Sequence, residues 1–260
     1  MIMKDLTKLV NDKIAEIAQD TAPAKEYPVE LPLGKYCDHT VLRAYTPKHI
    51  VKAFCQEGKT HGAASICVNP VHVKLVHDEL QGTDIKTCCV IGFPLGANRP
   101  EVKALETKLA IADGADEVDM VINIGSLRDK DYDAVYEDIK AVVDAAEGKA
   151  HVKVIIETCY LTKEEKIAAC VVSKEAGADY VKTSTGMGNG GATVEDVQLM
   201  KRVVGEDMLV KASTGIMNRD DVIAMVKAGA VRMGTSRLVQ IDTGDNDAYC
   251  ASKDNQPPQF

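Results

Sequence analysis

The sequence predicts an α/β fold, a (βα)8 TIM barrel with an extra N-terminal helix, formed by residues 1–260 as a single domain. Eight short apolar runs alternate with helical patterns, which is typical of a parallel sheet covered by helices. A Gly-Ala pair recurs at 62, 114, 177 and 229, each time after a helical pattern and before an apolar run. The intervals of 52, 63 and 52 residues each fit two βα units. Glycine at these positions suits the end of a helix, where the left-handed conformation is common.

The first predicted element is an amphipathic helix within residues 1–20. Its apolar residues recur at helical spacing, and they are Leu6, Leu9, Val10, Ile14 and Ile17. We expect this helix to cover one end of the barrel. Because the segment is charged and has no continuous apolar core, we expect it to be neither a signal peptide nor a membrane span. At the other end of the chain, we expect residues 245–260 to form a loosely structured tail.

The eight predicted strands follow in order, and several helix starts between them are marked by capping patterns. These patterns are Thr46-Pro47, Thr162-x-x-Glu165, Thr193-x-x-Asp196 and Asn218-x-x-Asp221. The strands are 35–42, 64–68, 85–92, 117–123, 152–157, 179–184, 208–213 and 231–236. A doubly wound open sheet is the alternative fold, but it would usually carry a G-x-G-x-x-G turn after the first strand.

Composition excludes several classes of function. A formal net charge of −8 argues against nucleic-acid or anionic-membrane binding, so an anionic substrate must meet a local positive site. The eight cysteines show no C-x-x-C spacing, which predicts buried free thiols in a reducing cytoplasm. The six histidines lack the spacing of zinc ligands such as H-E-x-x-H, which disfavours a metal-dependent mechanism.

Two lysines lie inside strand patterns, close to glycine-rich turns. Lys182 ends the sixth strand before Thr-Ser-Thr-Gly, and Lys211 has the same place in the seventh. A buried ammonium group is costly unless it is paired or neutralised. Two such groups on neighbouring strands should each make the other easier to deprotonate, and a neutral lysine attacks carbonyl groups. The pattern therefore predicts an enzyme that forms a Schiff base.

Charged residues from five predicted strands share an inward parity. Since side chains alternate along a strand, six of them should converge in the lumen, namely Lys153, Lys182, Lys211, Asp38, Asp119 and Glu157. Asp38 is expected to end the first strand, Asp119 suits a proton shuttle, and Glu157 is expected to anchor a loop. Any one of these residues alone fits a solvated or structural group. Their convergence where barrels hold their active sites favours catalysis.

Glycine-rich turns after strands six to eight fit an anion site. The run that includes Gly186 precedes the helix predicted to start at Thr193, whose free N–H groups can bind an anion. Gly215 and Gly234-Thr-Ser236 follow the next two strands, where barrels often hold phosphate.

These motifs resemble those of deoxyribose-phosphate aldolases, class I aldolases with a TIM barrel. The similarity runs from about Tyr36 to Ser236 and includes CDHTVL, CVNP, GFPLG, GADEVDMVINIG, KVIIETCYLT, VKTSTG, GGAT and KAS-x-G. The resemblance implies that Lys182 forms the Schiff base, that Lys211 perturbs it, and that Asp119 relays protons with Asp38 assisting. It also implies reversible cleavage of 2-deoxyribose 5-phosphate to acetaldehyde and glyceraldehyde 3-phosphate, with no metal or organic cofactor.

The same resemblance implies a phosphate site, and three residues depart from the family pattern there. The site would include Thr185, Gly186, Gly215, Gly234, Ser236 and Arg237. Thr214 stands where the family usually has glycine, Met217 where it has arginine, and Arg237 where it has a small residue. Thr214 resists a positive φ and narrows the space that a phosphate would occupy, whereas Arg237 adds a bidentate hydrogen-bond donor. Some relatives end in a tyrosine that reaches the site; Phe260 ends this chain, and Tyr249 is the nearby alternative.

Two other functions stay open at this stage. One is a Schiff-base aldolase with a different substrate range, and the other is a catalytically silent barrel that binds sugar phosphates. Two mutually repelling lysines beside Asp119 argue against the silent barrel. The expected partners are a small sugar phosphate and aldehydes, with no nucleic acid and no membrane. A homo-oligomer is compatible with the fold, but no exposed apolar stripe can be identified from the sequence.

Overall fold

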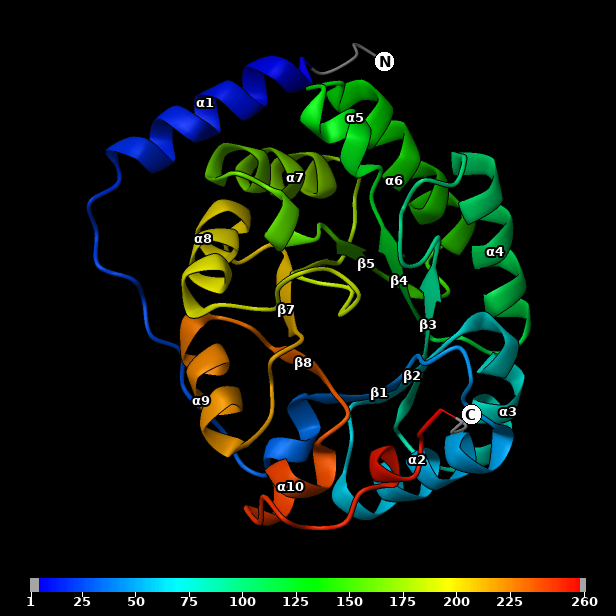
Figure 1. Cartoon of the computed structure of the whole chain (residues 1–260). Coiled ribbons are helices and arrows are strands. Elements are labelled where there is room, and N and C mark those ends of the chain that lie inside the picture. Colours follow the sequence, from blue (N-terminus) through cyan, green and yellow to red (C-terminus); the bar gives the residue numbers. More distant parts are fainter. Residues whose placement is uncertain (1–4, 258–260) are drawn as a thin grey trace.

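A computed structural model of the chain describes residues 5–257, which form a closed parallel barrel surrounded by helices (Figure 1). The strands are hydrogen-bonded in chain order, and β1 pairs with β8 to close the barrel. They are β1 (Cys37–Val41), β2 (Ser65–Val68), β3 (Lys86–Ile91), β4 (Glu117–Val121), β5 (His151–Ile155), β6 (Tyr180–Lys182), β7 (Leu209–Ser213) and β8 (Arg232–Thr235). Each overlaps a predicted strand, so the predicted fold class is confirmed.

Helices connect the strands and form the outer ring. They are α2 (Lys48–His61), α3 (Val73–Glu79), α4 (Pro100–Ala112), α5 (Ile124–Arg128), α6 (Tyr132–Ala146), α7 (Lys163–Glu175), α8 (Val194–Val204), α9 (Arg219–Ala228) and α10 (Leu238–Thr243), after the N-terminal α1 (Leu6–Gln19). Four short 3-10 helices complete the described elements, namely η1 (Leu33–Tyr36), η2 (Pro70–His72), η3 (Thr158–Tyr160) and η4 (Ala251–Lys253).

The helix boundaries follow from local sequence. The glycines of the four Gly-Ala pairs all have positive φ, between 63° and 111°, as expected for residues that end helices. Thr162 and Asn218 form capping boxes, and Thr193 accepts a hydrogen bond from the Asp196 N–H. The start predicted at Thr46 is wrong by one residue, because Pro47 is the N-cap of α2 and the Thr46 hydroxyl donates to the Arg43 carbonyl instead.

The main core lies between the strands and the helices, and the lumen of the barrel is polar. On β4 and just beyond it, Val118, Met120 and Ile122 are fully buried in this core, whereas Glu117 and Asp119 alternate with them. This alternation matches the predicted parity, because successive side chains of a strand point to opposite faces. The same alternation directs the charged residues of β5, β6 and β7 inward.

The N-terminal helix was expected to cover one end of the barrel, and this expectation is wrong. α1 packs against α7, with smaller contacts to α6 and α8, so it extends the outer ring (Figure 1). Its apolar face buries Leu6, Val10 and Ile17 there, because the outward face of α7 offers a second apolar surface. No helix of residues 5–257 has the length and apolar character that crossing a membrane requires.

The C-terminal tail, expected to be loosely structured, is ordered up to residue 257. The Ala251 N–H donates to Glu57 Oε1 of α2 at 2.6 Å, and the Asn255 side chain donates to the Thr46 hydroxyl at 2.9 Å. Ala251 and Asn255 are buried by these contacts. The polar residues of the tail bind the barrel through hydrogen bonds that the composition alone does not reveal. Phe260 lies outside the described residues.

Candidate active site

Asp119 lies at the centre of a buried network of charges in the lumen. Its Oδ2 atom accepts hydrogen bonds from Lys182 Nζ at 2.8 Å and Lys211 Nζ at 2.7 Å, and its Oδ1 atom from Lys153 Nζ at 2.9 Å. Lys182 is 3% exposed, and the other three residues are fully buried. The predicted convergence of these lysines on Asp119 is therefore confirmed.

Strand register explains why these side chains meet. Lys182 and Lys211 are direct partners in the β6–β7 pair, and Asp119 and Lys153 are direct partners in the β4–β5 pair. Parallel strands hold such partners side by side on the same face of the sheet. Closure of the barrel then brings the two pairs together across the lumen.

A second set of charges lies next to this network. Lys211 Nζ is 2.5 Å from Asp38 Oδ2, and Lys153 Nζ is 2.6 Å from Glu117 Oε2. Arg232 of β8 joins the two carboxylates, donating to Asp38 Oδ1 at 2.7 Å and to Glu117 Oε1 at 2.8 Å. Asp38 is the second residue of β1 and does not end the strand as predicted, because the pairing of β1 with β2 continues to Val41.

Arg232 and Glu117 were not predicted as site residues. A signal for Arg232 was present, because it shares the inward parity of β8 with Gly234. A Cβ atom at Gly234 would lie 2.3 Å from Ser213 Oγ, so no side chain fits in the lumen there. With Arg232 the network holds four cationic groups and three carboxylates, so loss of one proton from a lysine would balance the charges.

The pKa values of Asp38 and Asp119 are lowered despite the burial of both carboxylates, so both stay ionised. Burial alone would raise the pKa of Asp119, but the ammonium groups of Lys153, Lys182 and Lys211 outweigh it and hold that pKa well below its ordinary value. Burial of Lys211 favours its neutral form, yet Asp119 and Asp38 raise its pKa. The prediction that the two lysines ease each other's deprotonation is thus wrong for Lys211, since a shared carboxylate separates them.

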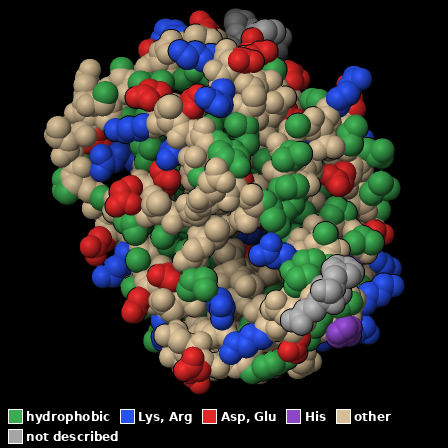
Figure 2. All heavy atoms as spheres, in the orientation of Figure 1, with side chains coloured by type: hydrophobic (Ala, Val, Ile, Leu, Met, Phe, Trp, Pro, Cys, Tyr) green, Lys and Arg blue, Asp and Glu red, His purple; other side chains and the backbone are tan. Residues whose placement is uncertain are grey.

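A cavity of about 390 Å³ opens at the C-terminal ends of the strands. The face of the molecule that carries this opening is hollowed near its centre, with Lys or Arg side chains at the rim (Figure 2). Among the seven charged residues of the network, Lys182 is the one that lines the cavity. Ser213 also lines it, and its buried hydroxyl has no hydrogen-bond partner among the described residues. Lys182 is therefore the amine that a small molecule in this cavity would meet.

The predicted phosphate residues gather at the same cavity. Its lining includes all six of them, Thr185, Gly186, Gly215, Gly234, Ser236 and Arg237. The Arg237 guanidinium pairs with no carboxylate within residues 5–257, so its donors remain available to an anion. Met217 lines the cavity and is 49% exposed. The tail contributes Ser252, Asn255 and Gln256, a part of the wall that sequence patterns did not predict.

Glu157 anchors the loop that carries Thr185, as predicted. Its buried carboxylate accepts from the Thr185 N–H at 3.3 Å and from the Thr185 hydroxyl. Glu157 itself has a positive φ of 55°, which turns the chain at the end of β5. The carboxylate thus fixes the β6–α8 loop. The prediction that Glu157 joins the other charged residues in the lumen is wrong, because β5 ends at Ile155 and the chain turns before Glu157.

Thr214 carries backbone strain at the rim of the cavity. Its φ is 71°, a conformation that β-branched residues rarely adopt. We expected this strain, because the family usually has glycine at this position. Its hydroxyl lies 3.0 Å from where a Cβ atom of Gly186 would be, so Thr214 also narrows the gap between two loops.

Thr214→Gly should stabilise the protein. Release of the strained φ is worth about 1 kcal/mol after the greater chain entropy of glycine is deducted. The melting temperature should rise by about 2–4 °C. Thr214→Ala is the matched control, because it keeps a Cβ atom at positive φ and should recover less. A Thr214→Gly variant that melts below the Thr214→Ala variant would show that the threonine is not strained.

Two groups of side chains come close enough to hold a metal ion by distance alone. They are His39, Glu57 and Cys250, and Cys67, Cys88 and Asp119. In the second group Asp119 is already bound by three ammonium groups, which would repel a cation. In the first group Glu57 accepts from His39 at 2.8 Å and holds the tail through Ala251. Histidine spacing along the sequence did not predict this cluster.

The cysteines agree with the predicted free thiols, with one correction. Seven are buried, Cys67 among them, and none forms a disulfide. Cys159 is exposed, because it lies in η3 after β5 rather than in a strand.

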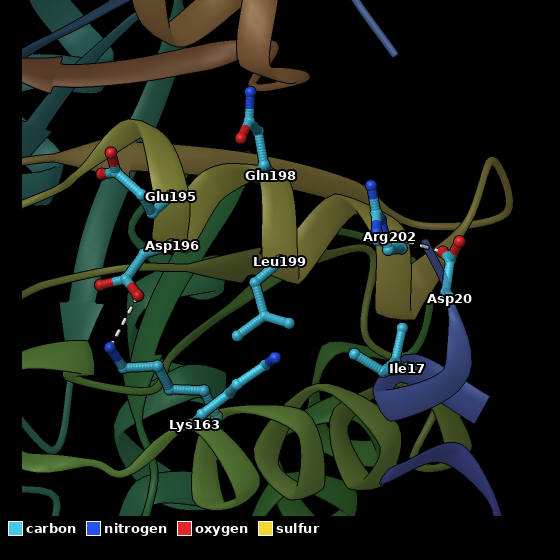
Figure 3. Close-up of a pocket in the computed structure, with 9 residues that line it drawn as sticks. Ile17, Asp20, Lys163, Glu195, Asp196, Gln198, Leu199 and Arg202 are labelled. Atoms are coloured by element: carbon cyan, nitrogen blue, oxygen red, sulfur yellow. Dashed lines mark hydrogen bonds and ion pairs between the residues drawn. The ribbon is translucent and has the colours of Figure 1, made fainter. Parts of the chain in front are cut away.

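A second cavity lies outside the barrel, between α1, α7 and α8 (Figure 3). It has a volume of about 430 Å³ and is lined by charged residues that pair with one another. Lys166 binds Asp196 at 2.6 Å, and Arg202 is 3.2 Å from Asp20. These pairs leave little unbalanced charge for a ligand, so the lumen cavity is the stronger candidate site.

Comparisons with known proteins agree with this geometry. A model of the DeoC/LacD family aldolase matches residues 34–241, a range that contains every charged residue of the lumen network. The chain is 59% identical to a deoxyribose-phosphate aldolase of Clostridium tetani over 209 residues, which is 80% of this chain and 97% of the relative. It is also 59% identical to a deoxyribose-phosphate aldolase of Macrococcus caseolyticus over 213 residues, 82% of this chain and 96% of the relative.

Solved structures show the same fold. A protein from Coccidioides immitis superposes with a TM-score of 0.87 at 40% identity, over 92% of this chain and 96% of the other. The tetrameric deoxyribose phosphate aldolase of Aeropyrum pernix superposes with a TM-score of 0.77 at 31% identity, over 83% and 91% of the two chains. With its barrel, its lumen lysines and this coverage, the chain belongs to the DeoC/LacD family of aldolases.

Proposed function

We propose that the protein is a class I, metal-independent lyase that reversibly cleaves 2-deoxy-D-ribose 5-phosphate to acetaldehyde and D-glyceraldehyde 3-phosphate. The observation that carries this proposal is the position of Lys182, which borders the cavity while its Nζ atom lies 2.8 Å from the Asp119 carboxylate. The names of the Clostridium tetani and Macrococcus caseolyticus relatives support the choice of substrate.

The reaction begins with covalent capture of the substrate aldehyde. The neutral Lys182 amine attacks C1 of the open-chain sugar, and loss of water from the carbinolamine leaves an iminium ion. Asp119, acting through a water molecule, takes the proton from the C3 hydroxyl; the C2–C3 bond then breaks and its electrons flow into the iminium group. Glyceraldehyde 3-phosphate leaves, and the remaining enamine gains a proton at C2. Water then releases acetaldehyde and restores the lysine.

Asp119 acts as a relay for the protons of these steps. It contacts Lys182 directly, so it can receive the proton that the amine loses. Because three ammonium groups hold its pKa well below the ordinary value, a proton does not rest on Asp119. The carboxylate passes the proton on to the carbinolamine hydroxyl, directly or through a water molecule, and that hydroxyl leaves as water.

Lys211 and Asp38 help to keep the Asp119 carboxylate ionised. The raised pKa of Lys211 makes it a permanent cation beside Asp119, which stabilises the ionised carboxylate between proton transfers. Asp38 holds the Lys211 ammonium group at 2.5 Å and is itself bound by Arg232. Both residues act through Asp119 and Lys182, since neither lines the cavity.

The phosphate group would bind at the far side of the cavity. Gly186 and Gly215 have φ values of 82° and 87°, so their backbones can approach an anion closely. Ser236 and Arg237 add a hydroxyl and a cationic fork from the end of β8. This site supplies the local positive group that a protein with a net charge of −8 needs for an anionic substrate.

Arg237→Ala should raise KM for 2-deoxyribose 5-phosphate by about 10- to 100-fold, the loss expected for charge-assisted hydrogen bonds to one phosphate. The KM for unphosphorylated 2-deoxyribose should change little, because that sugar offers no anion. Steady-state kinetics on both sugars test this difference. Arg43→Ala is the control, because Arg43 lines the cavity from the β1 side. Equal effects of Arg237→Ala on the two sugars would refute the assignment.

Borohydride reduction in the presence of 2-deoxyribose 5-phosphate tests the proposed chemistry. Reduction of the iminium ion should leave a stable adduct, and peptide mapping should place it on Lys182. A catalytically silent barrel would bind the sugar phosphate but give no adduct with it or with acetaldehyde. A Schiff-base aldolase of different substrate range would give the adduct with acetaldehyde but would not turn over the deoxy sugar.

Two further properties belong to the proposal. The buried free thiols support a reducing compartment such as the cytoplasm, where the enzyme would serve deoxyribose phosphate catabolism. The tetrameric relative from Aeropyrum pernix supports a homo-oligomer.

A further inference from the structure

The C-terminal tail forms part of the wall of the lumen cavity. Ser252, Asn255 and Gln256 line this cavity, and the short helix η4 packs against α2 (Figure 1). The three side chains are polar and uncharged, so they suit the hydroxyl groups of a sugar rather than its phosphate. The family model ends at residue 241, before the tail begins. The reason for the position of this wall must therefore lie in the contacts of the tail itself.

Glu57 of α2 makes the principal contact with the tail. Its Oε1 atom accepts a hydrogen bond from the Ala251 N–H at 2.6 Å, and the Cys250 thiol lies 3.4 Å from its Oε2 atom. Both tail residues are buried. Burial alone would raise the pKa of the Glu57 carboxyl, but hydrogen bonds from His39 and from the Ala251 N–H outweigh it and lower that pKa. The tail is thus held by an ionised carboxylate, which accepts hydrogen bonds about twice as strong as those between neutral groups.

A buried histidine fixes the direction of the Glu57 carboxylate. His39 of β1 is fully buried, and its Nε2 atom lies 2.8 Å from Glu57 Oε2. Because an ionised carboxylate only accepts hydrogen bonds, His39 carries a hydrogen on Nε2 and is the donor. The imidazole ring also stacks on Phe54, with the ring centroids 4.2 Å apart. Phe54 itself lines the cavity, so strand, helix and tail meet in one packed group.

A second hydrogen bond holds the end of the tail. The buried Asn255 donates through Nδ2 to the Thr46 hydroxyl at 2.9 Å. This bond joins two neutral groups and is the weaker of the two attachments. Ser252 lies between Ala251 and Asn255, so loss of the Glu57 contact would leave this part of the wall held from one side.

We propose that Glu57 is a positioning residue, which holds residues 250–256 against the cavity and thereby sets the affinity of the site for the sugar phosphate. Among the residues that the structure describes, Glu57 belongs neither to the lining of the cavity nor to the charged network of the lumen. Its influence on the substrate therefore passes through the tail and leaves Lys182 and Asp119 unchanged. The identity of this substrate rests on the proposed function.

Glu57→Ala should raise KM for 2-deoxyribose 5-phosphate by about 10-fold and change kcat by less than about threefold, because the wall is lost while the reacting groups stay in place. Glu57→Gln is the conservative variant. Its amide oxygen still accepts from the Ala251 N–H, so KM should stay within about threefold of the unmodified protein. Gln56→Ala is the control, because Gln56 is an exposed neighbour on α2 and should alter neither constant. Steady-state kinetics measure all three variants.

Ala251→Pro removes the same hydrogen bond from the tail and leaves the barrel untouched. Ala251 is the first residue of η4, and Cys250 before it has an extended backbone, with φ of −145° and ψ of 140°, which a following proline permits. This variant should raise KM as Glu57→Ala does. Because the barrel is unaltered, the comparison remains valid even where Glu57→Ala is too unstable to assay.

Hydrogen–deuterium exchange of the C-terminal peptide measures the attachment of the tail directly. Amide exchange within residues 250–256 should be faster in Glu57→Ala and in Ala251→Pro than in the unmodified protein, and unchanged in Gln56→Ala. A KM that rises without faster exchange, or faster exchange with KM unchanged, would overturn the proposal. A kcat that falls by as large a factor as KM rises would also overturn it.

Acetaldehyde separates a failure of this proposal from a failure of the proposed function. The borohydride adduct of this aldehyde with Lys182 should form equally in the unmodified protein and in each variant, since acetaldehyde carries no hydroxyl group for the tail to bind. Absence of the adduct from the unmodified protein would refute the proposed function. The dissociation constant of the sugar phosphate, measured by calorimetry, then replaces KM in the same comparison of variants.

Discussion

Replacing Lys182 with alanine should abolish the borohydride-trapped adduct and lower kcat by a factor on the order of 10⁴ or more. The effect is large because, in the proposed mechanism, every step after substrate binding uses the iminium ion on this nitrogen. Lys211 cannot take its place, since it is fully buried and does not line the cavity. The measurements are mass mapping of the reduced adduct and single-turnover cleavage of 2-deoxyribose 5-phosphate.

Lys182→Arg distinguishes the loss of iminium formation from the loss of the positive charge at this position. Arginine can still pair with Asp119 but is not deprotonated at neutral pH, so it cannot form the iminium ion. This variant should melt close to the unmodified protein and should still give no adduct. An adduct found on Lys211 or Lys153 in either variant would show that the wrong lysine has been identified as the nucleophile.

Asp119→Asn should lower both the free energy of unfolding and the rate of the reaction. The substitution leaves three ammonium groups around a neutral amide, and removal of one partner from a buried ion pair costs about 3–5 kcal/mol. Loss of the proton relay should lower kcat by about 10²- to 10⁴-fold. Chemical denaturation and steady-state kinetics measure the two effects separately.

Asp138→Asn is the matched control for Asp119→Asn. Asp138 is equally a buried carboxylate, and its partner is Lys103 at 2.7 Å, outside the lumen. Its substitution should lower the free energy of unfolding but leave kcat nearly unchanged at a temperature where the variant is folded. If both substitutions reduced kcat alike, the effect of Asp119→Asn would be explained by instability rather than by a relay.

The same carboxylate gives a pH dependence of stability. The folded state holds the pKa of Asp119 below its ordinary value, so the unfolded chain binds a proton more readily. The stabilisation from Asp119 is therefore complete above about pH 4, the ordinary range of an aspartate, and is lost as the pH falls further. Asp119→Asn should flatten this acid limb of the unfolding curve.

Much of the barrel and its site followed from local patterns. Glycine at the end of a helix needs no knowledge of distant residues, which is why the Gly-Ala pairs marked four boundaries correctly. Parity along a strand likewise placed Lys182, Lys211 and Asp119 in the lumen. A lysine in an apolar strand stands out, because such a residue is costly unless it is paired.

Other parts of the site depend on contacts between distant residues. Arg232 stands at the start of a strand, where a solvated arginine is common, and its role is visible only once β8 lies beside β1. The ordered conformation of the C-terminal tail was not predicted, because it depends on a hydrogen bond from Ala251 to Glu57, 194 residues away in the sequence. For α1, the apolar stripe showed that the helix is buried, but not which surface of the barrel it covers.

The pairing of Arg232 with Asp38 also affects how the chain folds during its synthesis on the ribosome. The two residues are 194 positions apart, so during synthesis Asp38 and Glu117 emerge long before the cation that joins them. Until β8 has left the ribosome, each carboxylate has only a lysine as its cationic partner, Lys211 for Asp38 and Lys153 for Glu117, and the strand that closes the barrel is missing. The unfinished chain therefore cannot close a lumen around its own charges. Lys182 is enclosed in the lumen only when the last strand is in place.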